Sequence, residues 1–311
     1  MSPELIIALL AAAVQAGTPI LYATLGEIIS EKSGVLNLGV EGVMAFSSFA
    51  GFLVCFVTGS AWLGFLAGGV AGALLCGLHS LVCQVFLGNQ VVSGLALAIF
   101  GVGLSNFFGT PYVGQGTEGF GKLALPYLAE LPVLGPILFR QDILVYLCYA
   151  LPVGVWFFLN RTSLGLRLRA AGEMPAAAAA AGLSPRGLRA LGTVLGGFLC
   201  GLGGAYISLA HMHLWTTGLS GGRGWVAVAL VVFAFWRPGR AVVGAFLFGG
   251  FMAFQLRLQA MGTNIPSSLL LMLPYALTIM ALVIPAIRTR RGKGAAAAAP
   301  AALGVNIEPE G

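Results

Sequence analysis

Charged and polar side chains gather between residues 26 and 42, in the sequence GEIISEKSGVLNLGVEG. They separate two long apolar segments: Glu27, Glu31, Lys32, Asn37 and Glu41. A solvated turn needs fewer residues, and residues 36–40 (LNLGV) are too apolar for an exposed loop. We expect the stretch to enter a membrane bundle, where non-helical backbone persists only if it is buried in protein or lines water. Ionisable groups at that depth are functional candidates. The alternative is a structural network that ties two helices together.

A second polar group stands at the start of a later apolar segment. Asn89, Gln90 and Ser93 are close together there, and Asn106 lies further along the same segment. Their amides and hydroxyls could face a cavity or simply hold neighbouring helices. His79 is expected to form hydrogen bonds between helices rather than to bind a ligand.

Catalytic motifs are absent from the sequence. There is no GxxxxGK[ST], so the chain does not bind ATP through a P-loop. There is also no HExxH, and the cysteines lack zinc-like or redox spacing. We therefore expect a protein that is not an enzyme and that holds no metal or cofactor.

The elements that position these residues are apolar helices. The chain has 311 residues, of which 58% are hydrophobic and 8% are charged, whereas soluble domains carry about 25% charged residues. A spanning helix needs roughly 20 apolar residues. The predicted fold is an all-α, polytopic membrane bundle with eight or nine spans. The predicted helices cover residues 5–25, 39–58, 62–86, 90–109, 143–160, 190–210, 241–257 and 267–287, with a weaker one at 224–236.

The weak segment 224–236 is followed at once by Arg237-Pro238-Gly239-Arg240. Thirteen helical residues reach only about 20 Å. The segment either crosses obliquely or forms a broken, re-entrant element, and we expect a crossing.

The distribution of Lys and Arg predicts the orientation. The loop 161–189 and the residues after 287 are rich in basic side chains and should face the cytoplasm, whereas the loop 110–142 should face outward. Counting spans places the N-terminus outside and the C-terminus in the cytoplasm. The membrane domain covers residues 1–291, and the Ala/Pro-rich tail at residues 292–311 is expected to be disordered.

The loop 161–189 contains the sequence TSLGLRLRAAGEMPAAAAAAGLSPRGLR. Pro175 and the alanines after it predict a short helix with Pro in its first turn, and Gly182 ends it. A helix lying on lipid would need large apolar residues on one side. This flat alanine surface suits docking to another protein.

At these motifs the chain resembles the permease subunits of ABC importers, the group that includes branched-chain amino acid, ribose and nucleoside permeases. It looks most like bacterial nucleoside or simple-sugar permeases. Four blocks carry the resemblance: GEIISEKSGVLNLGVEG, NQVVSGLALAIFGVGLSNF, TSLGLRLRAAGEMPAAAAAAGLS and GRGWVAVALVVFAFWRP.

The resemblance implies an inner-membrane permease that works with an ABC ATPase subunit, a second homologous permease in a heterodimer and an extracytoplasmic substrate-binding lipoprotein. ATP-driven closure of the ATPases would push on Pro175–Gly182. The residues implied in coupling are Arg169, Gly172, Glu173, Pro175, Ala178, Ala181 and Gly182. The residues expected to line the solute path are Asn37, Glu41, Asn89, Gln90, Ser93 and Asn106.

Two departures from the family pattern stand out. Ala98 occupies a position where the family often has Asn, and the segment Ala176–Ala181 is entirely alanine where charged or aromatic residues are usual. The first removes one polar contact from the expected path, and the second changes the surface offered to the ATPase.

Two other functions stay open on the sequence. One is a branched-chain amino acid ABC permease. The other is an ion-coupled secondary carrier that uses Glu27 and Glu41 as its ion sites. Membrane lipid is a partner in every case, and the lack of an aromatic-rich basic patch argues against nucleic acid.

Overall fold

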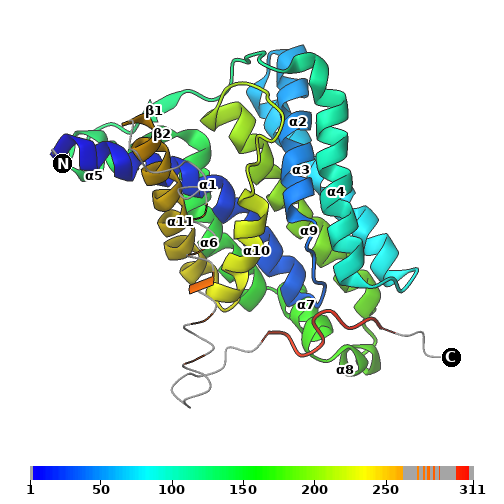
Figure 1. Cartoon of the computed structure of the whole chain (residues 1–311). Helices are drawn as coiled ribbons and strands as arrows, with labels where there is room; N and C mark the ends of the chain where they lie inside the picture. Colours follow the sequence, from blue (N-terminus) through cyan, green and yellow to red (C-terminus); the bar gives the residue numbers. More distant parts are fainter. Residues whose placement is uncertain are drawn as a thin grey trace.

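The structure is a computed structural model that describes residues 3–261 and 299–307 of the chain, with single positions between them: Met272, Ala276, Ile279, Met280, Val283 and Ile287. The predicted span at 267–287 therefore lies largely outside the described residues. Figure 1 shows a bundle of tilted helices.

Seven helices are long and apolar enough to cross a membrane. They are α1 (Pro3–Lys32), α2 (Val40–Thr58), α3 (Ala61–Gln84), α4 (Gln90–Gly109), α6 (Ile143–Arg161), α9 (Pro185–Tyr206, continued by the π-helix η3 at Ile207–His211) and α11 (Pro238–Ala260). Each coincides with a helix predicted from the sequence. The all-α, polytopic fold is confirmed.

Short elements cover the two ends of the bundle. The loop 110–142 forms η1 (Thr110–Tyr112), β1 (Lys122–Ala124), η2 (Leu128–Glu130), α5 (Leu134–Leu138) and β2 (Arg140–Asp142). Strands β1 and β2 pair antiparallel, with Lys122 opposite Asp142. This end, near the chain's first residues, is called the hairpin end. Helices α7 (Ser163–Glu173) and α8 (Pro175–Ala180) lie at the opposite end, called the α8 end (Figure 1).

Small residues let the central helices touch. Gly68 and Gly72 on α3 face Gly197 and Gly201 on α9. A Cβ added at Gly72 would lie 2.3 Å from the carbonyl oxygen of Gly197, and one added at Gly201 would lie 2.3 Å from that of Gly68. Glycines four apart thus serve as the backbone contact between helices that their spacing predicts.

Two interruptions break the regular crossings. Helix α1 continues to Lys32, so the prediction that it ends at residue 25 was wrong, and only residues 33–39 are non-helical. Those residues form the re-entrant segment, which leads from the α8 end up to the start of α2 inside the bundle (Figure 1).

The second interruption precedes α10 (Arg223–Phe233), which spans only about 16 Å. Residues 212–222 lead to it from the hairpin end, where Gly116 pairs with Leu214. Figure 1 shows α10 ending near the α8 end, where α11 begins. Residues 212–237 therefore pass from one end of the bundle to the other. Residues 212–222 cover the first part of this passage without forming a helix, and α10 covers most of the rest.

Candidate functional site

The re-entrant segment is held by side chains from three helices. The N–H of Leu36 donates to Gln90 Oε1 at 2.8 Å, and the N–H of Asn37 donates to Glu27 Oε1 at 3.1 Å. His79 Nε2 lies 3.2 Å from the carbonyl oxygen of Leu36. Non-helical backbone inside a membrane needs such partners because lipid supplies none. The stretch enters the bundle, as its sequence predicts.

His79 on α3 contacts both α4 and the re-entrant segment. Because a carbonyl oxygen only accepts, the proton lies on Nε2 of the neutral ring, and Nδ1 accepts from the Ser93 hydroxyl at 2.9 Å. The expectation that His79 forms hydrogen bonds between helices is confirmed.

Asn37 closes the turn before α2. Its Oδ1 accepts from the N–H of Gly39 at 2.8 Å, and its Nδ2 lies 3.4 Å from Cys76 Sγ. The side chain is 1% exposed. In this conformation Asn37 is occupied by the protein itself rather than presented to a cavity.

Glu41 joins the first turns of two helices. Its Oε1 accepts from Ser220 Oγ at 2.6 Å and from the N–H of Gly222 at 2.9 Å, and its Oε2 accepts from the N–H of Gly224 at 2.8 Å. A Cβ added at Gly224 would lie 2.4 Å from Glu41 Cα, so only glycine permits this approach. The carboxylate thus lies where the positive N-terminal ends of α2 and α10 meet.

A second carboxylate holds the other end of α10. Trp236, just after α10, donates its Nε1–H to Glu31 Oε2 on α1. Glu27, Glu31 and Glu41 therefore all accept hydrogen bonds from another segment of the chain. This pairing is what the structural-network interpretation predicts.

The six residues expected to line the path do not form one site. Asn37, Gln90 and Ser93 meet around Leu36, whereas Glu41 belongs to the contact with α10. Asn89 is exposed and caps α4 by accepting from the N–H of Val92. Asn106 lies roughly 24 Å further along α4, at about 1.5 Å per residue.

The loop between α7 and α9 has the predicted short helix. Pro175 opens α8, and Gly182, with φ +76°, follows its C-terminus. Ser184 then caps α9 by accepting from the N–H of Gly187. Ala178 packs inward, whereas its neighbours form an exposed alanine face: Ala176, Ala177, Ala180 and Ala181.

Residues flanking α8 contact the re-entrant segment directly. A Cβ at Gly172 would lie 2.3 Å from the carbonyl oxygen of Lys32, so the end of α7 rests against the end of α1. Arg189 on α9 is fully buried, and its guanidinium lies against Gly34, whose φ of +98° favours glycine. Arg169 donates to Asn160 Oδ1 at 2.8 Å.

Residues 299–307, part of the tail for which disorder is expected, also lie here. Arg189 donates to the carbonyl oxygens of Ala302 and Val305, and the N–H of Ala301 donates to Glu173 Oε2. The Ala/Pro-rich composition carries no signal for this docking. The sequence gives no signal that distinguishes Arg189 from the other arginines of the loop 161–189.

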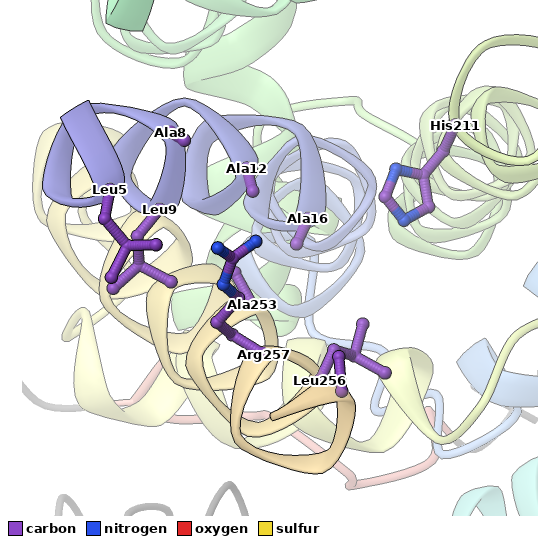
Figure 2. A pocket seen from close by; sticks show the side chains of 10 residues that line it. Leu5, Ala8, Leu9, Ala12, Ala16, His211, Ala253, Leu256 and Arg257 are labelled. Carbon is purple, nitrogen blue, oxygen red and sulfur yellow. The ribbon is translucent and has the colours of Figure 1, made fainter. Parts of the chain in front are cut away.

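The cavity in Figure 2 lies between α1 and α11 and has a volume of about 280 Å³. Its lining is Leu5, Ala8, Leu9, Ala12, Ala16, His211, Ala253, Leu256, Arg257 and Ala260. The guanidinium of Arg257 points across it toward α1, and His211 stands on the opposite side (Figure 2). With mostly apolar walls, it offers few partners for a polar solute.

A more polar cavity of about 590 Å³ opens at the α8 end. Its charged lining residues are Lys32, Arg169, Glu173, Arg237 and Arg240. The excess of cations favours an anionic group. Within the described part of the chain, no group of three or more His, Cys, Asp or Glu residues could hold a metal ion.

Comparison with known proteins agrees with these features. Residues 8–282 match the family described as the permease component of the branched-chain amino acid transport system. The chain is 48% identical to the putative glucose ABC transporter permease TsgC13 of Haloferax volcanii, over 81% of this chain and 78% of the relative.

Two further relatives are nucleoside permeases. The chain is 33% identical to the nucleoside ABC transporter permease NupC of Lactococcus lactis, over 86% of this chain and 88% of the relative. It is 34% identical to the guanosine ABC transporter permease NupQ of Bacillus subtilis, over 85% and 87%. No solved structure matches the chain. A family match over most of the sequence, on a bundle with seven spanning helices, shows that the chain belongs to the branched-chain amino acid transport system permease family and is a transport subunit rather than an enzyme.

Proposed function

We propose that this chain forms the transmembrane path for nucleosides or simple sugars in an ATP-driven ABC importer, together with a second permease subunit. The observation that carries the proposal is similarity, over 81% to 86% of the chain, to permeases named for glucose, nucleosides and guanosine. These solutes share hydroxyl groups, which amide and carboxylate side chains bind well.

ATP hydrolysis belongs to a separate subunit in this proposal, because the sequence has no P-loop. The exposed alanine face of α8 is the surface offered to that ATPase. Gly172 and Arg189, on either side of α8, contact the end of α1 and Gly34. A push on α8 would therefore reach the re-entrant segment through the adjoining ends of α7 and α9.

The moving part would be residues 33–39. Asn37 lies in this segment, Gln90 bonds it directly, and Ser93 is linked to it through His79. The partners of these polar groups change if the segment shifts. Rocking of this kind is a recognised way to alternate access. In this proposal Asn37 and Gln90 exchange their internal hydrogen bonds for hydroxyls of the solute. Glu41 keeps α10 in place, and Asn89 and Asn106 remain candidates nearer the two mouths of the path.

In the same proposal the chain lies in a bacterial inner membrane, with the α8 end on the cytoplasmic side and the N-terminus on the outer side. The positive-inside rule supports this orientation. Basic residues cluster at the α8 end: Lys32, Arg161, Arg167, Arg169, Arg186, Arg189, Arg237 and Arg240. A substrate-binding lipoprotein would then dock at the hairpin end.

A branched-chain amino acid permease is the second candidate, and the family description favours it. An amino acid zwitterion needs partners of both charges. The groups around Leu36 are neutral amides, a hydroxyl and an imidazole, apart from Glu27. The structure favours a secondary carrier less. Such a carrier would use Glu27 and Glu41 as ion sites, and both carboxylates already accept hydrogen bonds from backbone N–H groups.

Uptake by the assembled importer would test the proposed cargo. The complex in liposomes, given ATP and its binding protein, should accumulate labelled guanosine or glucose and not labelled leucine. Accumulation of leucine alone would refute the nucleoside or sugar assignment and support the amino acid candidate.

A further inference from the structure

The C-terminal hook, residues 299–307, bridges the coupling region and the re-entrant segment. We propose that the hook sets the position of the re-entrant segment relative to α8, with Asn306 and Arg189 as its positioning residues. This inference rests on the proposed transport function and adds a coupling element that the family resemblance does not include.

One side of the hook is bound to the flanks of α8. The N–H of Ala302 donates to the carbonyl oxygen of Gly172 at 3.0 Å, and the N–H of Ala301 donates to Glu173 Oε2 at 3.1 Å. Arg186, at the start of α9, donates to the carbonyl oxygen of Ile307 at 2.8 Å. The hook therefore contacts the chain both before and after α8.

Arg189 makes the hook part of the fold rather than an incidental contact. A guanidinium stays charged, and a buried charge needs partners. Arg189 is 0% exposed, and its three carbonyl acceptors belong to Ala171, Ala302 and Val305. Two of the three lie on the hook. Without the hook, the guanidinium would keep a single acceptor among the described residues.

The other side of the hook is bound to the re-entrant segment. The N–H of Gly304 donates to the carbonyl oxygen of Gly34 at 3.3 Å. Asn306 Nδ2 donates to the carbonyl oxygens of Leu87 and Gly88, at 2.7 and 3.1 Å, in the turn before α4. The hook thus also touches the turn from which Gln90 projects.

Gln90 relays this contact. Its Nε2 donates to Asn306 Oδ1 at 3.2 Å, while its Oε1 accepts from the N–H of Leu36 at 2.8 Å. One buried amide therefore holds the hook with one atom and the re-entrant segment with the other. Leu303 and Ala299 add apolar packing against the core.

The consequence is mechanical. A movement of α8 relative to the re-entrant segment must either carry the hook along or break its hydrogen bonds. A hook that couples the two regions should affect how much solute is moved per ATP, whereas a purely stabilising hook should affect only the amount of folded protein.

Paired variants of the assembled importer would separate these possibilities. In Asn306→Ala, solute uptake per ATP hydrolysed should fall about 5-fold while ATP hydrolysis continues, a change typical of one coupling contact. Truncation after Ile307 removes residues 308–311, leaves the hook intact and should behave as the unmodified chain. An unchanged ratio of uptake to hydrolysis in Asn306→Ala would overturn the proposal.

Hydrogen exchange on the unmodified complex provides a test that needs no variant. The amides of Ala301, Ala302 and Gly304 should exchange slowly at rest and faster when ATP hydrolysis is trapped with vanadate. Exchange at the rate of a free peptide in both states would also refute the hook. Failure of the unmodified complex to import any solute with ATP would instead refute the proposed function, and resting-state protection would still report on the hook.

Discussion

The Glu41 carboxylate accepts a hydrogen bond from the backbone N–H of Gly224 at 2.8 Å, which joins the first turn of α2 to the first turn of α10. The two helices run in opposite directions from this point (Figure 1). One side chain thus connects the two helices that follow the interruptions of the bundle. Glu41 and Gly224 are far apart in the sequence.

Removal of this carboxylate should destabilise the protein. Glu41→Ala leaves the N–H groups of Gly222 and Gly224 without their acceptor, and we expect a loss of about 3 kcal/mol, since bonds to charged groups are worth about 1.5–3 kcal/mol each. Thermal unfolding in detergent would measure it. Glu4→Ala, at an exposed position in the first turn of α1, is the control. Equal stability of the two variants would show that Glu41 does not hold α10.

The contact between α3 and α9 should reject a single methyl group. Gly72→Ala forces a Cβ against the carbonyl oxygen of Gly197, and we expect a loss of about 3 kcal/mol from overpacking. Gly103→Ala on α4 is the matched control, because no atom lies within 4 Å of its added Cβ. That change should stabilise the helix by about 1 kcal/mol. The same thermal shift for both variants would argue against this helix contact.

Asp142 should make stability depend on pH. It caps α6 by accepting from the N–H groups of Leu144 and Val145, and burial raises the pKa of its carboxyl despite these hydrogen bonds. Because the folded chain holds the proton more tightly than the unfolded chain, stability falls as the pH rises from the unfolded pKa through the raised folded pKa.

The substitution Asp142→Asn keeps an acceptor for the cap and removes the titration. It should be as stable as the unmodified chain or more stable at neutral pH, and its stability should vary less between pH 4 and neutrality, given an ordinary Asp pKa of about 3.9. Asp142→Ala should lose about 1 kcal/mol through the missing cap. A strong loss of stability in Asp142→Asn at neutral pH would contradict the raised pKa.

The exposed face of α8 should tolerate a small polar residue but not a charge at the ATPase contact. Ala180→Glu is expected to lower co-purification of the ATPase about 10-fold, since burying an unpaired charge is costly. Ala180→Ser changes little in size and is the control. Retention of the ATPase by the Glu variant would place the contact elsewhere on the α8 end.

The helices were predictable from the sequence because long uncharged runs have few alternatives to spanning a membrane. The helical conformation of residues 26–32 was not predictable, since Glu27 and Glu31 interrupt the apolar pattern. Their burial depends on Asn37 and Trp236, and the Trp236 partner is separated from Glu31 by most of the chain. Single-sequence patterns do not contain such distant partners.

The candidate site was predictable in part. Asn37, Gln90 and Ser93 do meet, because the helix start at Gln90 faces the segment that contains Asn37. Asn106 was grouped with them on chemistry alone, and helix geometry separates it. The hook escaped prediction because most of its own hydrogen-bonding groups are main-chain groups, which every composition supplies.

Uptake by proteoliposomes with and without the ATPase subunit tests most directly that this chain is a path driven by a separate motor. With the complete importer and binding protein, solute should accumulate only when ATP is supplied. Liposomes that hold this chain and its partner permease alone should show no accumulation under any ion gradient. Gradient-driven accumulation without the ATPase would contradict the importer account.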